Sequence, residues 1–315
     1  MARTAAVLGA SGFVGGHVTK WLRQTSVVVK PVRAPRMAHS VASLKLDPYE
    51  AYLFDMLSEC DVVVNAAGVA DAVGSSQDME WANHRLPGLL AQVTARLGVR
   101  LVHMSSAAVQ GRRPALDSSA EYAPFSPYSA SKAAGERAVL AHSSTACIYR
   151  PPGVHGPDRA VTQKLVRLAR GRWATVASPG DQNSPQALIE NVADAIAFLA
   201  TTEEELPRIV HHPSEGLTVS SLLHLLGGRP PRRVPQTLAS AAISAAFLAG
   251  RARPGLQGHA RRLEMVLVGQ EQAPSWLTAV GWRAPYCAGR WAELGRTSLG
   301  SSHTGSLESH RTSKR

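Results

Sequence analysis

Five short apolar runs alternate with longer helical patterns in the first half of the chain. Between the runs, apolar side chains recur at helical spacing, as Val14, Val18 and Leu22 do. Strands that are apolar along their whole length and separated by helices predict a parallel sheet covered on both faces. Right-handed crossovers make this a Rossmann-like, doubly wound α/β sheet. The predicted strands lie at residues 5–8, 27–29, 61–65, 99–104 and 146–149.

The pattern changes after Pro151, where prolines become frequent and the helical patterns shorter. We therefore expect a sheet domain over residues 1–155 and a smaller, mixed C-terminal substrate domain over residues 156–296. A helix near residues 189–200 is expected to pack back on the first domain. Residues 297–315 are rich in Ser, Thr and Gly and poor in large apolar side chains, which predicts a disordered tail.

The longest apolar stretch runs from about Leu238 to Ala249 and is interrupted by serines. A membrane span needs about 20 apolar residues. This stretch is therefore expected to form a buried helix, and no membrane partner is expected. The N-terminus has no sustained apolar core and does not resemble a signal peptide.

The composition is that of a folded protein, since 44% apolar and 18% charged residues exclude wholesale disorder. The formal net charge of +11 raises nucleic acid, a membrane surface or an anionic small molecule as partners. Residues 228–315 hold 13 Lys and Arg against 4 acidic residues, and thus most of the excess. Aromatic residues make up 5% and are not interleaved with basic ones. An anionic or polar small-molecule substrate is therefore expected, and no nucleic acid.

The three cysteines, Cys60, Cys147 and Cys287, are far apart in the sequence. They form neither a disulfide framework nor a metal-ligand pattern. We expect a reducing, cytoplasmic compartment and no bound metal.

A glycine-rich loop, GASGFVG, follows the first predicted strand and opens a helical pattern. Glycine lets backbone approach a pyrophosphate closely, and the helix N-terminus offers N–H groups and a positive dipole. The loop predicts dinucleotide binding, with a plain tight turn as the alternative. Its predicted cofactor-binding residues are Gly9, Ser11, Gly12, Phe13, Val14 and Gly15.

The second predicted strand is followed by Lys30, Arg33 and Arg36, with no acidic residue among them. An acid would hold the ribose of NAD, whereas a basic side chain such as Arg33 suits the 2′-phosphate of NADP. NADP is therefore favoured over NAD, and a solvated basic loop is the alternative. Asp47 is a candidate for holding the adenine, the alternative being an ordinary helix cap.

Tyr128 and Lys132 stand four residues apart, which on a helix places them on one face. An ammonium beside a phenol lowers the phenol pKa and suits it to proton transfer at a carbonyl or carbinol oxygen. Ser106 follows the fourth predicted strand and is a candidate for a hydrogen bond to the same substrate oxygen. The alternatives are a chance surface pair and a serine that caps a turn.

These motifs, in this order, resemble the extended short-chain dehydrogenase/reductase superfamily, also called the NAD-dependent epimerase/dehydratase family. The resemblance covers roughly residues 4–200 and includes DVVVNAAG, MSSAAVQG, PYSASK and YRPPGVHGP. It implies hydride transfer to or from a nicotinamide cofactor, with Tyr128 as acid/base, Lys132 as its partner and Ser106 at the oxyanion. It also implies further cofactor-binding positions at Ala66, Ala67, Gly68, Asn83, Pro151 and Val154, besides Tyr128 and Lys132 themselves.

Three features of the sequence depart from the pattern of the nucleotide-sugar enzymes in this family. Ser184 and Pro185 stand where an arginine clamps the substrate diphosphate, Asn191 replaces an aspartate, and Gln110 replaces a tyrosine. A nucleotide-sugar substrate then needs another cation. The candidates are Arg159, Arg167, Arg232 and Arg233.

Three functions are compatible with these residues. The first is an NAD(P)-dependent oxidoreductase acting on a carbonyl or alcohol of a sugar-derived or other polyfunctional metabolite. The second is a nucleotide-sugar epimerase or dehydratase that retains its NAD, and the third is a non-enzymatic cofactor sensor or nucleic-acid-binding protein. The missing acid after the second strand favours the first. Homodimers are common in the family, so a homodimer stays open here.

Overall fold

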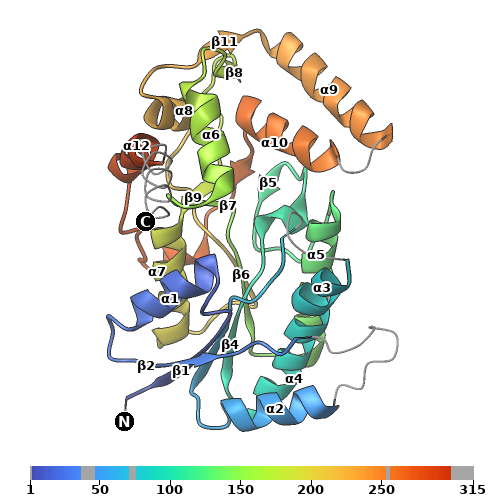
Figure 1. Cartoon of the computed structure of the whole chain (residues 1–315), viewed down its shortest axis with the longest axis vertical. Helices are drawn as coiled ribbons and strands as arrows, with labels where there is room; N and C mark the ends of the chain where they lie inside the picture. Colours follow the sequence, from blue (N-terminus) through green and yellow to red (C-terminus); the bar gives the residue numbers. More distant parts are fainter. Residues whose placement is uncertain (1, 37–46, 71–75, 253–255, 299–315) are drawn as a thin grey trace, which may run out of the picture.

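The computed structural model describes residues 2–36, 47–70, 76–252 and 256–298 (Figure 1). A six-stranded sheet lies at its centre, and every neighbouring pair of strands in it is parallel. In spatial order the strands are β10 (Ile209–His211), β6 (Cys147–Arg150), β4 (Arg100–Met104), β3 (Val62–Asn65), β1 (Thr4–Leu8) and β2 (Val28–Val32).

This arrangement confirms the predicted Rossmann-like α/β fold. The strand order reverses between β1 and β3, so the crevice outside their carboxyl ends is where such a sheet binds a ligand. The strand β10 was not predicted, because it has only three residues, Ile209–His211, which are too few to show the periodicity of a strand. It joins the sheet from the stretch that the sequence assigned to the second domain.

Helices cover both faces of the sheet, which is why its strands are apolar throughout. Ala5 and Val7 point to the face covered by α1 and α7, whereas Ala6 and Leu8 point to the opposite face. The first face carries α1 (Phe13–Leu22) and α7 (Ile189–Thr201), and the second carries α2 (Asp47–Leu57), α4 (Leu86–Leu97) and α5 (Pro127–His142). A short helix, α3 (Ser76–Glu80), and a π-helix, η2 (Trp81–Arg85), precede α4.

A smaller lobe lies beyond the carboxyl ends of the strands (Figure 1). Its core is formed by α6, α8 and α12, whose apolar side chains pack around the fully buried Trp291. The lobe contains short parallel strand pairs, β7 with β9, β8 with β11 and β12 with β5. The bounds of the remaining elements are η3 (Ala107–Gln110), β5 (Ala115–Leu116), β7 (Gly153–His155), α6 (Ala160–Arg170), β8 (Thr175–Ala177), β9 (Gln186–Leu188), α8 (Val219–Gly227), β11 (Arg232–Val234), α9 (Gln236–Ala252), α10 (Gln257–Leu267), β12 (Glu271–Gln272), α11 (Trp276–Ala279) and α12 (Ala288–Thr297).

The helix α9 corrects one expectation. The stretch around Leu238 to Ala249 is helical as predicted, but it is not buried, since Leu238 is 62% and Leu248 66% exposed. Only one side of α9 packs into the lobe, through Ala239 and Ile243. Within the described ranges, no helix is long and apolar enough to cross a membrane. The predicted tail lies, from residue 299 onward, outside the described residues.

The asparagine that replaces the family's aspartate has a structural reason. Asn191 is buried on α7, and its Nδ2 donates to Glu215 Oε1 (2.8 Å) and to the Tyr286 carbonyl (2.9 Å). The buried Glu215 also accepts from the Leu188 N–H and from Trp291 Nε1. A second carboxylate at this position would face Glu215 without a proton to donate, so an amide is required here.

We expect Asn191→Asp to destabilise the protein by about 3 kcal/mol near neutral pH. Repulsion by Glu215 raises the folded-state pKa of the introduced carboxyl group above its unfolded value. The added cost is therefore absent at low pH and grows as pH rises through that raised pKa. Urea denaturation at several pH values measures this.

Asn183→Asp is the matched control, because Asn183 donates to Glu271 at the surface (2.5 Å). Solvent screening should limit its cost to less than about 1 kcal/mol. An Asn191→Asp protein as stable as the wild type at pH 8 would contradict this account of Asn191.

Candidate active site

The glycine-rich loop connects β1 to α1 and lies against the residues that follow β3. Gly9 has φ +80°, and a Cβ there would lie 2.7 Å from the Ala67 nitrogen. A Cβ on Gly15 would overlap the Gly9 carbonyl, and the Ala66 N–H donates to the Leu8 carbonyl (3.0 Å). Glycine is thus required for the loop to lie against β3 and for α1 to start directly behind it.

The N-terminus of α1 is the part of this loop that can hold phosphate. The helix begins at Phe13, with Gly12 as N-cap, so no cap side chain occupies its first N–H groups. Ser11 and Gly12 are exposed, whereas Val14 and Gly15 are buried beneath them. The backbone cradle therefore fits a dinucleotide pyrophosphate.

The helix α5 begins just before Tyr128 for local reasons. Ser126 and Ser129 form a reciprocal capping box, and Pro127 occupies the first turn. Tyr128 therefore lies in the first turn, half-buried, and Lys132 follows one turn later. Because both residues lie in α5 and are four residues apart, they share one face of the helix, as predicted.

Lys132 is almost completely buried, and its Nζ donates to the Met104 carbonyl at the end of β4 (3.1 Å). Burial lowers the pKa of Lys132 to about 8, although the nearby Glu136 carboxylate opposes the shift. Burial thus disfavours the charged form of Lys132, and pKa values shifted in this way are typical of functional sites.

Asn83 and Gly68 complete the surroundings of Lys132. A Cβ on Gly68 would lie 3.0 Å from both Lys132 Nζ and Asn83 Oδ1. The Asn83 side chain bonds both backbone groups of Val69 and also donates to Ser131 Oγ (3.0 Å). Asn83 lies in the π-helix η2, and α5 approaches its backbone so closely that a Cβ on Gly135 would overlap the Asn83 carbonyl.

Ser106 lies at the end of β4 beside the loop that follows β6. Its Oγ accepts from the Ala108 N–H (3.2 Å), so it caps the short helix η3. The neighbouring Ala107 N–H donates to the Pro151 carbonyl (2.9 Å). Gln110, where the family has tyrosine, is buried and bonds both the side chain and the N–H of Asp117. Gln110 therefore shapes this turn.

Sequence reasoning raised Arg159 only as one of four candidate cations, and the structure brings it to the site. It donates from Nη1 to the Val154 carbonyl (2.7 Å) and lies over the Phe13 ring, 5.0 Å from its centroid. Burial lowers the pKa of Arg159, while the electrostatic interaction with Tyr128 raises it. Arg167, Arg232 and Arg233 are exposed on α6 and β11 of the lobe.

Two buried polar pairs lie beside the site, and the sequence analysis did not predict either of them. Arg150 of β6 and Glu136 of α5 form a bidentate ion pair with no exposed side-chain surface (2.6 Å). Asn65 Nδ2 donates to His103 Nδ1 (3.1 Å), and its Oδ1 accepts from the Ala67 N–H (3.1 Å). The sequence carried no signal for either, since each pair joins different strands or helices.

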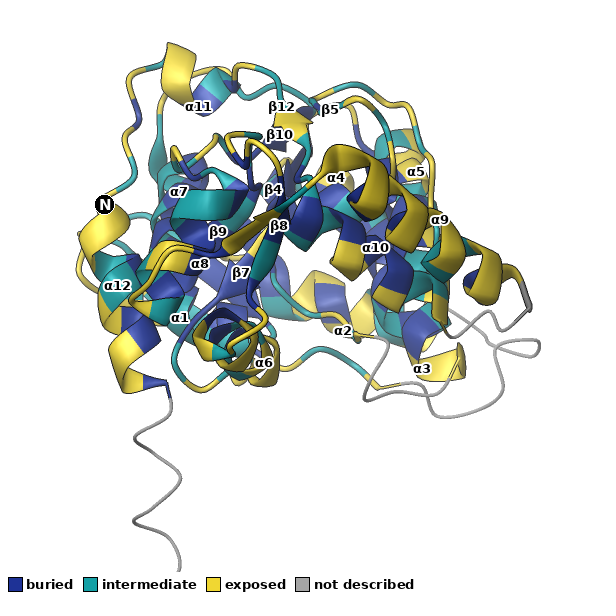
Figure 2. Ribbon diagram, turned by 90° about the horizontal axis from the view of Figure 1, so that it is seen from above, coloured by how far each residue is buried: buried dark blue, intermediate teal, exposed yellow. Residues whose placement is uncertain are grey.

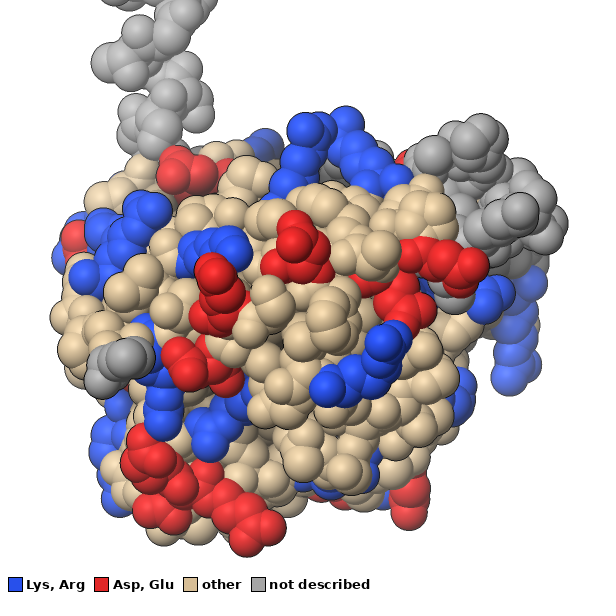
Figure 3. Space-filling model, turned by 90° about the horizontal axis from the view of Figure 1, so that it is seen from below, with Lys and Arg blue, Asp and Glu red and all other residues tan. Residues whose placement is uncertain are grey.

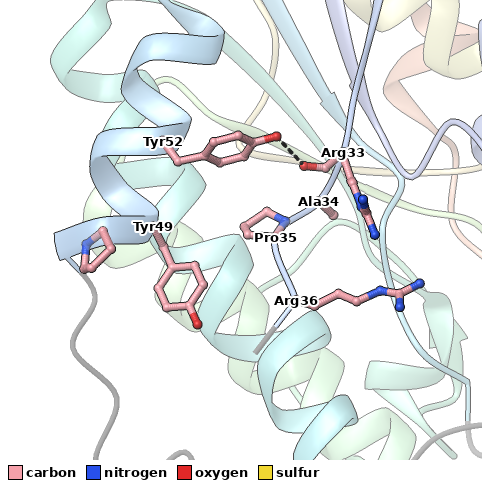
Figure 4. A pocket seen from close by; sticks show the side chains of 7 residues that line it. Arg33, Ala34, Pro35, Arg36, Tyr49 and Tyr52 are labelled. Carbon is pink, nitrogen blue, oxygen red and sulfur yellow. Dashed lines mark hydrogen bonds between the residues drawn. The ribbon is translucent and has the colours of Figure 1, made fainter. Parts of the chain in front are cut away.

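Arg33 follows the end of β2, next to the glycine loop, because Val32 pairs with Leu8. Figure 4 shows Arg33 and Arg36 beside a surface hollow of about 530 Å³ that Tyr49 and Tyr52 also line. The Tyr52 hydroxyl donates to the backbone carbonyl of Arg33 (3.1 Å). The Arg33 residue itself is exposed. Asp47 opens α2 and lines a different hollow, together with Glu50 and Arg96.

Comparison with known proteins identifies the class. The model of the NAD dependent epimerase/dehydratase family matches residues 5–211, which is most of the chain, so the chain belongs to this family. It is therefore an NAD(P)-dependent enzyme of the extended short-chain dehydrogenase type, as expected. Among the described residues, no group of three His, Cys, Asp or Glu is arranged to hold a metal ion.

Curated relatives and solved structures resemble the chain over much of its length. The dTDP-4-dehydrorhamnose reductase of Mycobacterium tuberculosis (strain ATCC 25618 / H37Rv) is 29% identical over 225 residues, 67% of this chain and 70% of the relative. The ceramide reductase of Caulobacter vibrioides (strain NA1000 / CB15N) is 29% identical over 240 residues, 71% of each chain. The crystal structure of dTDP-4-dehydrorhamnose reductase from Bacillus anthracis str. Ames in complex with NADP superposes with a TM-score of 0.63 at 17% identity, covering 95% of this chain and 99% of that one. This last likeness shows the fold alone.

The burial of Lys132 predicts a pH-dependent stability. The folded pKa of about 8 lies below the ordinary value of 10.5, so the unfolded chain binds more protons between these pH values. Lys132→Met removes the buried charge and should stabilise the protein by about 2 kcal/mol at pH 7. The difference should shrink as pH rises from 8 towards 10.5, because the wild type then gains stability.

Thermal unfolding from pH 6 to pH 10 measures this difference. The exposed Lys164, changed to Met, serves as control and should show no such trend. A Lys132→Met protein that is less stable than the wild type at pH 7 would show that the ammonium is better solvated than its burial indicates.

Proposed function

We propose that the protein is an NADP(H)-dependent reductase of a carbonyl group on an anionic, polyfunctional metabolite of the sugar-nucleotide class. The observation that carries the proposal is the Tyr128–Lys132 pair on α5. Its lysine is buried against β4 and lies next to Gly68 and Asn83, at the strand ends that also hold the glycine loop.

The residues of this chain have distinct tasks in the reaction. When bound, NADPH supplies the hydride to the substrate carbon. The Tyr128 hydroxyl donates a proton to the carbonyl oxygen, and the Lys132 ammonium stabilises the phenolate that forms. Ser106 Oγ donates a hydrogen bond to the same oxygen as negative charge develops there. Asn83 fixes the backbone at Val69 and, through Ser131, the first turns of α5.

The remaining predicted residues bind the cofactor in this proposal. The loop from Gly9 to Gly15 and the α1 N-terminus hold the pyrophosphate, and Ala66, Ala67 and Gly68 line its other side. Pro151 and Val154 lie at the nicotinamide end. The exposed Arg33 suits a 2′-phosphate, with Asp47 near the adenine side.

Arg159 supports an anionic substrate. In this proposal it takes the role of the arginine that Ser184 and Pro185 replace, since its always-charged, bidentate donor group lies over Phe13 and interacts electrostatically with Tyr128. The relatives named above include an enzyme named for a substrate that carries a nucleotide diphosphate, and we propose that Arg159 binds such a group here.

Tyr128→Phe tests the proton transfer. Loss of the hydroxyl should lower kcat by about 100-fold or more, while NADPH binding changes little. Fluorescence titration with NADPH and a panel of keto-sugar nucleotides measure the two effects. The exposed Tyr286, changed to Phe, should leave both unchanged. Full activity of Tyr128→Phe would refute the assignment, and turnover without net NADPH consumption would favour an epimerase or dehydratase.

Arg33→Gln tests the choice of cofactor. Removing the charge should raise the Kd for NADPH by about tenfold, because a charge-assisted hydrogen bond to the 2′-phosphate is lost. Binding of NADH, which lacks that phosphate, should not change. Arg23→Gln, an exposed arginine at the end of α1, is the control. Equal effects on both cofactors would place the 2′-phosphate elsewhere.

A further inference from the structure

Two segments of the lobe are basic and contain no acidic residue. Residues 159–180 hold five Lys and Arg and residues 228–263 hold seven, and neither segment contains Asp or Glu. The two segments meet where β8 pairs with β11 and where α9 contacts β8 (Figure 1). The exposed cations of the two segments are Lys164, Arg167, Arg170, Arg172, Arg229, Arg232, Arg233, Arg251 and Arg262.

The opposite end of the molecule is different. Figure 3 shows acidic and basic side chains interleaved there, as is usual for a solvated surface. The charge of the lobe is therefore a local property of this surface and does not extend over the whole molecule.

An exposed apolar face runs along α9, much of which is exposed in Figure 2. It consists of six exposed Leu and Ala side chains that share one side of the helix, because they recur at spacings of three and four. The buried Ala239 and Ile243 lie on another side. The residues of this apolar face are Leu238, Ala241, Ala242, Ala245, Leu248 and Ala249.

Trp173 extends the surface at the N-terminal end of α9. Its ring is 67% exposed and lies between two guanidinium groups, those of Arg172 (5.1 Å) and Arg232 (5.0 Å). Trp173, Leu238 and Leu248 are the three most exposed large apolar side chains of the described residues. A contiguous exposed apolar surface of this kind ordinarily marks a site that a binding partner covers.

We propose that this surface, formed by the apolar face of α9, Trp173 and the surrounding arginines, binds the surface of an anionic lipid bilayer. An interfacial helix places Leu and Trp side chains at the headgroup–acyl boundary, while Arg side chains contact anionic headgroups. The helix lies on the bilayer and does not cross it. The expectation of no membrane partner rested on the lack of a spanning segment, which surface binding does not need.

Two other occupants fit the charges less well. A second copy of the chain, related by a two-fold axis, would place these arginines against one another without an acid to neutralise them. Nucleic acid would meet an aliphatic face at the centre, where only Trp173 offers a ring for stacking. The bilayer alone matches both the apolar face and the positive rim.

Sedimentation with vesicles tests the proposal on the full-length protein. Vesicles of phosphatidylglycerol mixed with phosphatidylcholine should bind the protein, more weakly as salt is raised, and vesicles of phosphatidylcholine alone should bind it poorly. Leu238→Gln combined with Leu248→Gln should lower partitioning by about tenfold. Arg233→Gln and Arg262→Gln should each lower it by about fivefold.

Matched changes away from the lobe serve as controls. Val28→Gln on the exposed edge strand β2 and Arg23→Gln on α1 should leave partitioning unchanged. All the changed side chains are exposed, so circular dichroism and NADPH binding should match the wild type.

Three results would overturn the proposal. One is equal binding to charged and neutral vesicles, or none to either. Another is a dimer in solution that the leucine variant dissociates, which would assign the face to a second copy. The third is salt-sensitive binding of RNA or DNA that competes with vesicles. Because the assay needs no substrate, its failure would leave the proposed reductase activity untouched.

Discussion

A fully buried ion pair between Arg150 of β6 and Glu136 of α5 holds the helix that carries Tyr128 and Lys132. The same guanidinium donates to the carbonyls of Asp117 and Ser119, so it also fixes the segment that follows Ser106. Separating the pair would leave a charge in the core, at a cost of about 3–5 kcal/mol. One interaction thus sets the mutual position of the three residues to which we assign the chemistry.

The site also depends on the control of charge around Lys132. His103 lies in the sheet beneath it, and burial together with the Lys132 charge keeps the pKa of His103 well below its ordinary value. His103 accepts from Asn65, so the neutral ring carries its proton on the other nitrogen. A neutral histidine adds no second positive charge beside the lysine, and the network extends through Asn65 to the Ala67 backbone at the cofactor crevice.

The two parts of the molecule use charge differently. In the sheet domain, buried ionic groups are paired or hydrogen-bonded and fix positions, as Glu136 and Lys132 do. In the lobe, residues 159–180 and 228–263 carry exposed cations without any acid in either segment, and the second segment includes the exposed apolar face of α9. The first pattern suits a preorganised reaction site, and the second suits a contact with an extended anionic partner.

The amino-acid sequence by itself determined the fold class, the glycine loop and the common face of Tyr128 and Lys132. Each of these depends on local periodicity or on spacing within one loop or helix, which neighbours in the chain decide. Only the tertiary structure decided the Arg150–Glu136 pair, the approach of Arg159 to Phe13, and the partner that makes an asparagine necessary at position 191. These contacts join residues far apart in the chain, on which periodicity carries no information. The exposure of α9 belongs here too, because apolar residues cover most of the circumference of this helix, and its sequence does not reveal which apolar side packs against the lobe and which meets solvent.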